Sequence, residues 1–348
     1  MGKRTRSHPE NSRSTMTIRE IASLAGVSTA TVSRVINEPD KVSEETRDRV
    51  ETVMREHHFV ADGLAGGLAS RKSRTIGLII PTIANSIYAS STQAAQRVAQ
   101  GAGYTVLVGV SDFSAHTEAA LIHRLLERRV DGLILTGADR DREVYAKITH
   151  NKVPFVITWQ LTKSADLPAV SFDNYKAAAA ATAYLLSLGH ARIGLICGRT
   201  DVNDRAFERR RAYEESLKGA GIAIDPALIH ECDFDIFEGR AVMSRMIALH
   251  DRPTAVFCAN DIQAIGAITA CQDANLRVPD DISIMGFDDL PIAQYTTPKL
   301  TTVRVPADEM GTRAAGALIA AIRENGAVQS MELPTDLIAR DSTAALRQ

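Results

Sequence analysis

The sequence predicts an α/β protein with a small helical unit at the N-terminus and a large core built on parallel β-sheets. Three short helical patterns fall between residues 17 and 57. From Ile76 onward, short apolar, β-rich runs alternate with amphipathic helical stretches. This alternation is typical of βα units, which build parallel sheets covered by helices.

Length and composition fit a globular protein of more than one domain. The 348 residues suggest two or three domains, and 45% hydrophobic with 24% charged residues is an ordinary globular balance. No apolar stretch reaches the roughly 18 residues of a membrane helix. The N-terminus, MGKRTRSHPENSRSTM, lacks the apolar centre of a secretory signal. We therefore expect a cytoplasmic protein with no membrane partner, preceded by a disordered basic tail over residues 1–15.

Charge and cysteine content add little on their own. Residues 1–74 hold 13 Lys and Arg against 10 Asp and Glu, and the remainder holds 27 against 32. The N-terminal part therefore tolerates a polyanion better, although solvated surface charge explains these numbers as well. The cysteines share neither CxxC spacing nor His partners. We interpret them as core residues and expect no metal and no cofactor.

The helical unit begins with a capping box. Thr17 is placed to cap the first helix, with Glu20 reaching back to it. After an interruption at residues 26–27, Ser28 caps a second helix over residues 29–37. Ser43 is expected to cap a third helix. Three short helices in this order fit a helix-turn-helix head.

The second helix separates into two faces. Its apolar face holds Val32, Val35 and Ile36. The other face carries Thr29, Ala30, Ser33, Arg34 and Asn37. Short polar groups and one Arg suit a helix in the major groove of DNA, where Arg bonds guanine and Asn bonds adenine or a phosphate. An ordinary three-helix domain with a polar face is the alternative.

The core reads as two similar α/β lobes. Its strand-like runs cover residues 76–80, 104–110, 131–136, 154–158, 192–196, 254–258 and 282–286. The tetrapeptide Ile-Gly-Leu-Ile occurs at 76–79 and again at 193–196, each time followed by a βα series. A small-molecule site is expected between the lobes, at the carboxyl ends of the strands.

Polar or aromatic residues follow several of these strands. They are Asn85, Thr136, Trp159, Asp173, Arg209, Asn260 and Asp288. Carboxylates accept from sugar hydroxyls, an Arg donates to hydroxyls or acids, and an indole offers a stacking face. The alternative is structural, because an Asp or Asn after a strand often caps the next helix.

Several longer motifs resemble the lactose/galactose-repressor family. In the head these are I-A-x-x-A-G-V-S at 21–28 and T-V-S-R-V-I-N at 31–37. In the core they are GHARIGLI (189–196), AND (259–261), VPDDISIMGFDD (278–289) and PKLTTVRVP (298–306). The resemblance covers nearly all of residues 16–340. It implies a dimeric regulator, usually a repressor, with a two-lobed parallel α/β core like that of periplasmic sugar-binding proteins.

The resemblance assigns roles within the head. Thr29, Ala30 and Arg34 match base-contacting positions of the family. The positions that match backbone-contacting or backbone-bordering residues are Thr17, Ser28, Ser33 and Asn37. Ala30 is too short for a hydrogen bond, so readout there would be apolar, as with a thymine methyl group. Helix N-termini at Thr17 and Ser28 also suit phosphates.

Within the core, the resemblance places effector contacts at Arg209 and Asp288. Ala212 stands where the family usually has Gly, and Ser86, beside Asn85, stands where it has Pro. SFDNYKAAA and CQDANLRVPDD look similar to the gluconate-repressor branch. A sugar acid, with Arg205 assisting Arg209, and a neutral hydroxylated ligand on Asp288 both remain open.

Residues 63–74 join head and core as a hinge. Gly63, Gly66 and Gly67 disfavour a helix, which fits a flexible linker. The resemblance favours a short helix that forms on DNA and places Leu68 at the family's minor-groove wedge.

Other protein classes lack their motifs. No GxGxxG follows a strand, and no Walker, GxSxG or HExxH motif occurs, so an enzyme is not expected. A sugar-transport protein would need a secretion signal and would not use the head. The sequence thus predicts a sequence-specific DNA-binding regulator, a homodimer on double-stranded operator DNA, controlled by a small sugar-like effector. Its expected domains are the tail (1–15), head (16–62), hinge (63–74) and core (75–340).

Overall fold

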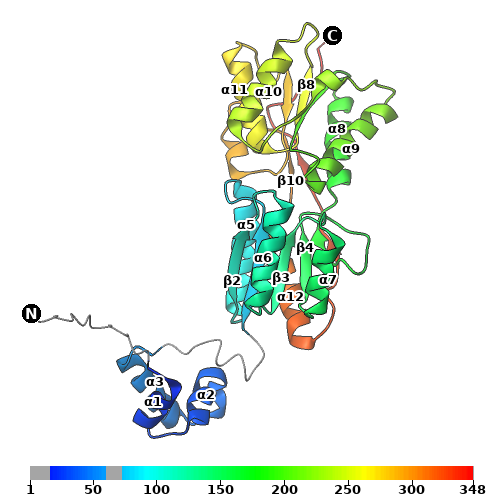
Figure 1. Ribbon diagram of the computed structural model, residues 1–348. Helices are drawn as coiled ribbons and strands as arrows, with labels where there is room; N and C mark the ends of the chain where they lie inside the picture. Colours follow the sequence, from blue (N-terminus) through cyan, green and yellow to red (C-terminus); the bar gives the residue numbers. More distant parts are fainter. Residues whose placement is uncertain (1–15, 60–72, 348) are drawn as a thin grey trace, which may run out of the picture. The chain divides into compact units, whose positions relative to one another are not determined.

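The chain divides into two compact units, residues 1–73 and 74–348 (Figure 1). The computed structural model describes residues 16–59 and 73–347. The expected tail over residues 1–15 and the hinge residue Leu68 lie outside these ranges. No helix within the described ranges has both the length and the apolar character that crossing a membrane requires.

The N-terminal unit holds the three predicted helices. They are α1 (Ile18–Leu24), α2 (Thr29–Asn37) and α3 (Glu44–Glu56), with a 3-10 turn (Pro39–Lys41) before α3. The capping box is present, since the Thr17 amide donates to the Glu20 carboxylate and the Glu20 amide donates to the Thr17 hydroxyl. Ile21, Val32 and Val50, one from each helix, are buried together. The amphipathic spacing therefore produced the expected small core.

Ser43 behaves differently from the expectation. It occupies the N-cap position of α3, but its side chain accepts no backbone hydrogen bond from that helix. Its hydroxyl donates instead to the Thr46 hydroxyl at 2.9 Å. The first turn of α3 carries Glu44 and Glu45, whose charge favours the helix N-terminus without a side-chain cap.

The second unit contains two lobes with the same strand order. The N lobe has β1 (Thr75–Ile80), β2 (Thr105–Val110), β3 (Gly132–Thr136) and β4 (Phe155–Thr158), all parallel in the order β2-β1-β3-β4. The C lobe has β6 (Ile193–Cys197), β7 (Ile229–Glu231), β8 (Ala255–Cys258) and β9 (Ser283–Met285), parallel in the order β7-β6-β8-β9. The repeated order confirms the two similar α/β lobes.

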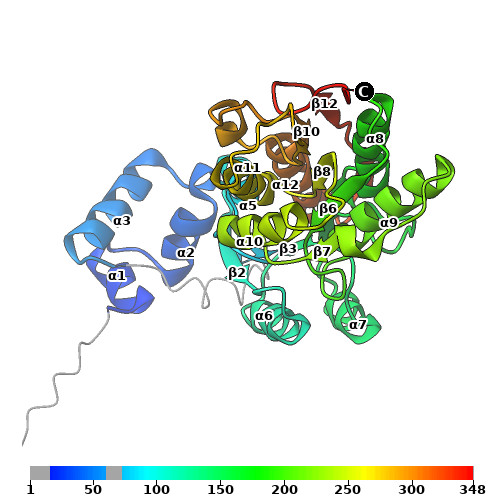
Figure 2. The ribbon, with the colours of Figure 1, turned by 90° about the horizontal axis from the view of Figure 1, so that it is seen from above.

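Helices cover both faces of each sheet (Figure 2). The N lobe has α5 (Ser86–Gly101) and α12 (Ala307–Glu324) on one face, and α6 (Ala115–Glu127) and α7 (Arg142–His150) on the other. The C lobe has α8 (Asn174–Ser187) and α9 (Asp204–Gly219) on one face, and α10 (Ile236–Ile247) and α11 (Asp261–Asp273) on the other. Burial on both faces explains the continuous apolar runs of the other predicted strands. The edge strand β2 differs, because its apolar residues Leu107, Val108 and Val110 are exposed.

The glycine of the repeated tetrapeptide lets a helix approach the central strand. A Cβ atom at Gly77 in β1 would lie 2.7 Å from a methyl group of Leu125 on α6. A Cβ atom at Gly194 in β6 would lie 3.0 Å from the sulfur of Met246 on α10. The repeat in the sequence therefore marks equivalent packing in the two lobes.

Three crossings of the chain connect the lobes within residues 73–347 (Figure 1). The first leads through β5 (Val170–Ser171) into α8, and the second leads through β10 (Thr302–Arg304) into α12. The third leads from β11 (Met331–Glu332), which pairs with β5, to β12 (Asp336–Ile338), which pairs with β10. One cluster of buried apolar side chains includes residues of both lobes, such as Ile76 of β1 and Phe257 of β8. Both lobes therefore share a core beside their strand ends.

The four cysteines are free and buried, as expected of core residues. Burial raises the pKa of the Cys197 and Cys271 thiols to about 12. Because the thiolate is the reactive form, burial disfavours reaction at these side chains at neutral pH.

Candidate functional site

In the head, α2 presents a polar face away from the small core. Val32 and Val35 are buried, whereas Thr29, Ala30 and Arg34 are exposed. Ser33 is half-buried, and Asn37 is the last residue of the helix. The exposed residues occupy consecutive turns of one helix face, so a flat or grooved partner can contact them together.

The N-termini of α1 and α2 carry the two other predicted head residues. Thr17 caps α1 within the capping box. The Ser28 hydroxyl accepts a hydrogen bond from the Thr31 amide at 3.1 Å and so caps α2. Both side chains are thus engaged by their own helices, while the helix ends retain the positive partial charge that suits a phosphate.

In the core, five of the seven predicted residues come together at a deep cavity between the lobes. Asn85, Trp159, Arg209, Asn260 and Asp288 line it. The other lining residues are Ile87, Tyr88, Asn203, Arg205, Ala206 and Phe234. These side chains come from both lobes, and several of them lie in loops that follow strands. The cavity is therefore between the lobes at the carboxyl ends of the strands, as the sequence predicted.

Three asparagines around this cavity share one role. Asn85, Asn203 and Asn260 cap α5, α9 and α11, and each accepts backbone hydrogen bonds through Oδ1. This leaves the Nδ2 amino groups as donors, and that of Asn260 donates to the Asp288 carboxylate. Each of these asparagines can therefore cap a helix through Oδ1 and still offer its amino group to a ligand.

Arg209 and Asp288 form the polar floor of the cavity. The Arg209 Nη1 lies 4.0 Å from Asp288 Oδ1 and donates to the Ala259 carbonyl at 2.6 Å. The Arg209 Nε donates to Asn174 Oδ1 at 2.9 Å, and the guanidinium stacks on the Phe287 ring at 3.8 Å. Burial raises the pKa of Asp288 to about 8, although Arg209 opposes this shift.

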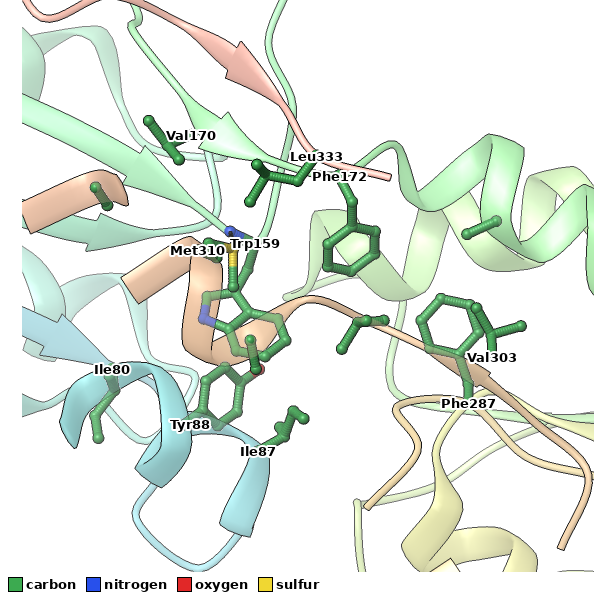
Figure 3. Close-up of a cluster of buried hydrophobic side chains, with 14 of the residues drawn as sticks. Ile80, Ile87, Tyr88, Trp159, Val170, Phe172, Phe287, Val303, Met310 and Leu333 are labelled. Carbon is green, nitrogen blue, oxygen red and sulfur yellow. Dashed lines mark hydrogen bonds between the residues drawn. The ribbon is translucent and has the colours of Figure 1, made fainter. Parts of the chain in front are cut away.

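An aromatic cluster forms the wall beside this floor (Figure 3). Trp159 packs edge-on against Tyr88 at 5.0 Å and against Phe172 at 6.2 Å between ring centroids. Trp159 and Asp288 have φ angles of +69° and +120°, which side chains with a Cβ rarely adopt. Dense packing holds both residues in these conformations, as is common at binding sites.

Thr136 and Asp173 do not line the deep cavity. The Thr136 hydroxyl donates to the Ile79 carbonyl at 2.9 Å, although the residue lines a neighbouring cavity. Asp173 caps α8 by accepting from the Lys176 amide at 3.0 Å. The alternative interpretation of an Asp after a strand as a helix cap therefore describes Asp173 well.

The predicted set omitted Asn203, Asn174 and Phe234. Asn203 carries the same signal as Asn85 and Asn260, a helix cap in the loop that follows a strand, and could have been included. Asn174 acts on the site through its partners, because its Oδ1 accepts from Arg209 and its Nδ2 donates to the Trp159 carbonyl. Phe234 lies between β7 and α10, and β7 was not among the predicted strands, so no predicted strand end pointed to its place beside the cavity.

The cleft between the lobes includes three adjoining cavities among the residues that the structure describes. The deep cavity measures about 20 Å³, a side cavity about 120 Å³ and an outer cavity about 340 Å³. Arg205 lines both the deep and the side cavity, and Phe234 lines both the deep and the outer one. No cluster of His, Cys, Asp and Glu in the described parts of the chain has the arrangement of a metal site. The cleft therefore offers amide and guanidinium donors, a carboxylate and aromatic rings.

Comparison with known proteins agrees with this division into head and core. Residues 17–62 match the family described as bacterial regulatory proteins, lacI family, and residues 182–343 match the periplasmic binding protein-like domain. The chain is 34% identical over 331 residues to the HTH-type transcriptional repressor CytR of Escherichia coli K12, covering 95% of this chain and 97% of that protein.

Two solved structures extend the similarity to the whole fold. The lac repressor dimer bound to operator and the anti-inducer ONPF has a TM-score of 0.83 at 28% identity, covering 95% of this chain and 99% of that one. The complex of the transcriptional regulator CelR with cellobiose has a TM-score of 0.69 at 28% identity, covering 94% and 99%. Curated relatives such as CytR are named as repressors rather than enzymes. The chain belongs to the lacI family of bacterial regulatory proteins.

Proposed function

We propose that this protein is a cytoplasmic transcriptional repressor whose affinity for operator DNA is controlled by a small sugar-like effector bound between the core lobes. It acts as a homodimer, because one head offers few base contacts and two-fold pairing is the commonest assembly. Its working parts are the head (16–62), the hinge (63–74) and the core (75–340).

The exposed face of α2 carries the DNA-binding proposal. Arg34 is the one exposed guanidinium of this helix and suits a bidentate contact with guanine. Thr29 and Ala30 lie one turn earlier, where Ala30 suits a thymine methyl group. Ser33 and Asn37, with the helix ends at Thr17 and Ser28, suit the sugar-phosphate backbone, and Leu68 suits the minor groove.

The DNA-binding test begins with selection of a binding site from random duplexes by the full chain. Arg34→Ala should then lose about 1–3 kcal/mol per half-site on the selected DNA while keeping weak binding to random DNA. Arg55→Ala is the matched control, because Arg55 is an exposed arginine on α3. If Arg34→Ala weakens selected and random DNA equally, Arg34 contacts only phosphates.

The chemistry of the deep cavity carries the effector proposal. Asn85, Asn260 and Arg209 supply donors, Asp288 supplies an acceptor, and Trp159 supplies an aromatic face. Few polar groups converging on an aromatic wall suit a hydroxylated ring. The CelR structure is a complex with a sugar. A sugar acid belongs to the same class, because Arg205 and Arg209 both reach the cavity.

The effector test screens neutral sugars, sugar acids and nucleosides by thermal shift of the full chain. Calorimetry with the best compound should then show that Asp288→Asn loses binding. Asp173→Asn is the matched control, because Asn also caps helices well and Asp173 does not line the deep cavity. Unchanged affinity in Asp288→Asn would remove Asp288 from the effector site.

A further inference from the structure

One side chain bridges the two lobes beside the deep cavity. Asp204 is the first residue of α9, in the C lobe. Its Oδ2 accepts hydrogen bonds from the amides of Ala138 at 2.6 Å and Asp139 at 3.2 Å, in the N-lobe loop that follows β3. Its Oδ1 accepts from Arg205 Nη1 at 2.7 Å. The carboxylate thus joins the lobes through two amide donors, while Arg205 of its own helix supplies a third hydrogen bond.

The loop that receives Asp204 is shaped for this contact. Gly137 has a φ of +77°, and a Cβ atom there would lie 2.1 Å from Arg205 Nη1. Behind the loop, the buried Arg140 guanidinium donates to the carbonyls of Thr136 and Gly137. Because the Gly137 carbonyl points toward Arg140, the Ala138 amide of the same trans peptide points the opposite way, toward the carboxylate. Glu118 holds Arg140 in place at 2.7 Å.

The bridge stands at the boundary between two cavities of the cleft. Asp204 and Arg205 line the side cavity, and Arg205 also lines the deep cavity, together with Tyr88. A second contact between the lobes lies nearby, where the rings of Phe113 and Phe234 are 5.9 Å apart. Asp204 therefore contributes to the contact between the lobes and also positions Arg205.

We propose that Asp204 is a latch that holds the lobes together, and that effector entry requires this latch to open. The deep cavity of about 20 Å³ is far smaller than the roughly 300 Å³ or more of ligand pockets. A sugar can reach Arg209 and Asp288 only if the lobes separate. The strength of the latch then sets part of the effector affinity, since binding must offset the cost of opening.

This role rests on the proposed effector site, but the latch itself is measurable without DNA or effector. Asp204→Asn keeps the size of the side chain and removes its charge, which weakens the bonds from both amides. Asp201→Asn is the matched control, because Asp201 lines the same side cavity but pairs with Arg199 inside the C lobe. Gly137→Ala perturbs the latch without changing any charge, since its Cβ would displace Arg205.

The experiment measures the distance between spin labels in the full chain by double electron–electron resonance. Labels go on cysteines introduced at Lys147 of α7 and Lys218 of α9, which are exposed, whereas the native cysteines are buried. In Asp204→Asn and Gly137→Ala we expect the closed-to-open ratio to fall about tenfold, which corresponds to about 1.4 kcal/mol. Asp201→Asn should match the parent protein.

Two results would overturn the latch. One is a distance distribution for Asp204→Asn and Gly137→Ala that coincides with that of the parent protein. The other is equal widening in Asp201→Asn, which would mean that acidity of the cavity matters and the bridge does not. Fluorescence of Trp159, the single tryptophan, verifies that each variant is folded. If no DNA is selected by the parent protein, the proposed function fails while the latch result stands.

Discussion

Replacing Asp288 by Asn should change how the stability of the core depends on pH. Asp288 is 3% exposed and meets one amide donor, from Asn260, with the nearest guanidinium nitrogen of Arg209 4.0 Å away. Burial costs the carboxylate more than these partners return, so its pKa rises from 3.8 to about 8. The folded protein therefore binds a proton at this site that the unfolded chain has released at neutral pH.

The sign and size of the effect follow from this linkage. A group whose pKa is higher in the folded state contributes stability that is complete below pH 3.8 and lost as pH rises toward 8. The loss is about 1.4 kcal/mol per pH unit, or about 2 kcal/mol between pH 6 and 8, where the slope flattens. Asp261, whose pKa burial raises to about 6, adds a similar slope only below this range.

The assay is urea unfolding of the full chain at pH 6, 7 and 8, followed by the fluorescence of Trp159. Asp288→Asn cannot titrate, so its free energy of unfolding should gain about 2 kcal/mol relative to the parent protein from pH 6 to 8. Asp201→Asn is the control. Its carboxylate is exposed and Arg199 lowers its pKa, so its difference from the parent should stay constant over this range. A constant difference for Asp288→Asn as well would refute the reasoning.

Three other changes have definite expected outcomes. Ser28→Ala removes the hydroxyl that accepts from the Thr31 amide, so thermal unfolding of the head should show a loss of about 1 kcal/mol. Gly266→Ala places a Cβ atom 2.2 Å from a carbonyl oxygen of α10 and should cost about 1–3 kcal/mol of core stability by urea unfolding, whereas Gly316→Ala, with open space around it, should cost nothing. Leu68→Ala should weaken binding to the selected operator in gel shifts while calorimetric effector affinity stays unchanged; equal operator affinity would exclude a wedge role.

The head could be predicted closely because its structure is local. The Thr17 capping box and the two faces of α2 depend on residues three or four positions apart, and these distances are visible in the sequence. Ser43 is the exception. It was predicted to cap α3 through its side chain, but its hydroxyl donates to the Thr46 hydroxyl and accepts no backbone amide of that helix. Competition between nearby hydroxyl partners is not encoded in a spacing pattern.

The cleft could be predicted in outline but not in detail. Residues directly after strands, such as Asn85, Asn260 and Asp288, reached the deep cavity because parallel strands end at one edge. Asp204 was not predicted as a contact between lobes, and Phe234 was not placed at the cavity. Their roles depend on the distance between the two lobes. That distance is set by the tertiary structure, and no local sequence pattern indicates it.

During synthesis the N lobe cannot complete its fold until a helix far from its strands in the sequence has been made. Its four strands are complete at Thr158, but α12, which covers one face, begins only at Ala307. That helix packs so closely on α5 that a Cβ atom at Gly311 would lie 2.1 Å from the Ser91 carbonyl oxygen. Until α12 leaves the ribosome, the apolar face around α5 and β3 has no cover, whereas the head needs nothing beyond its own three helices. A nascent chain therefore completes its head long before either lobe of the core can close around its apolar surface.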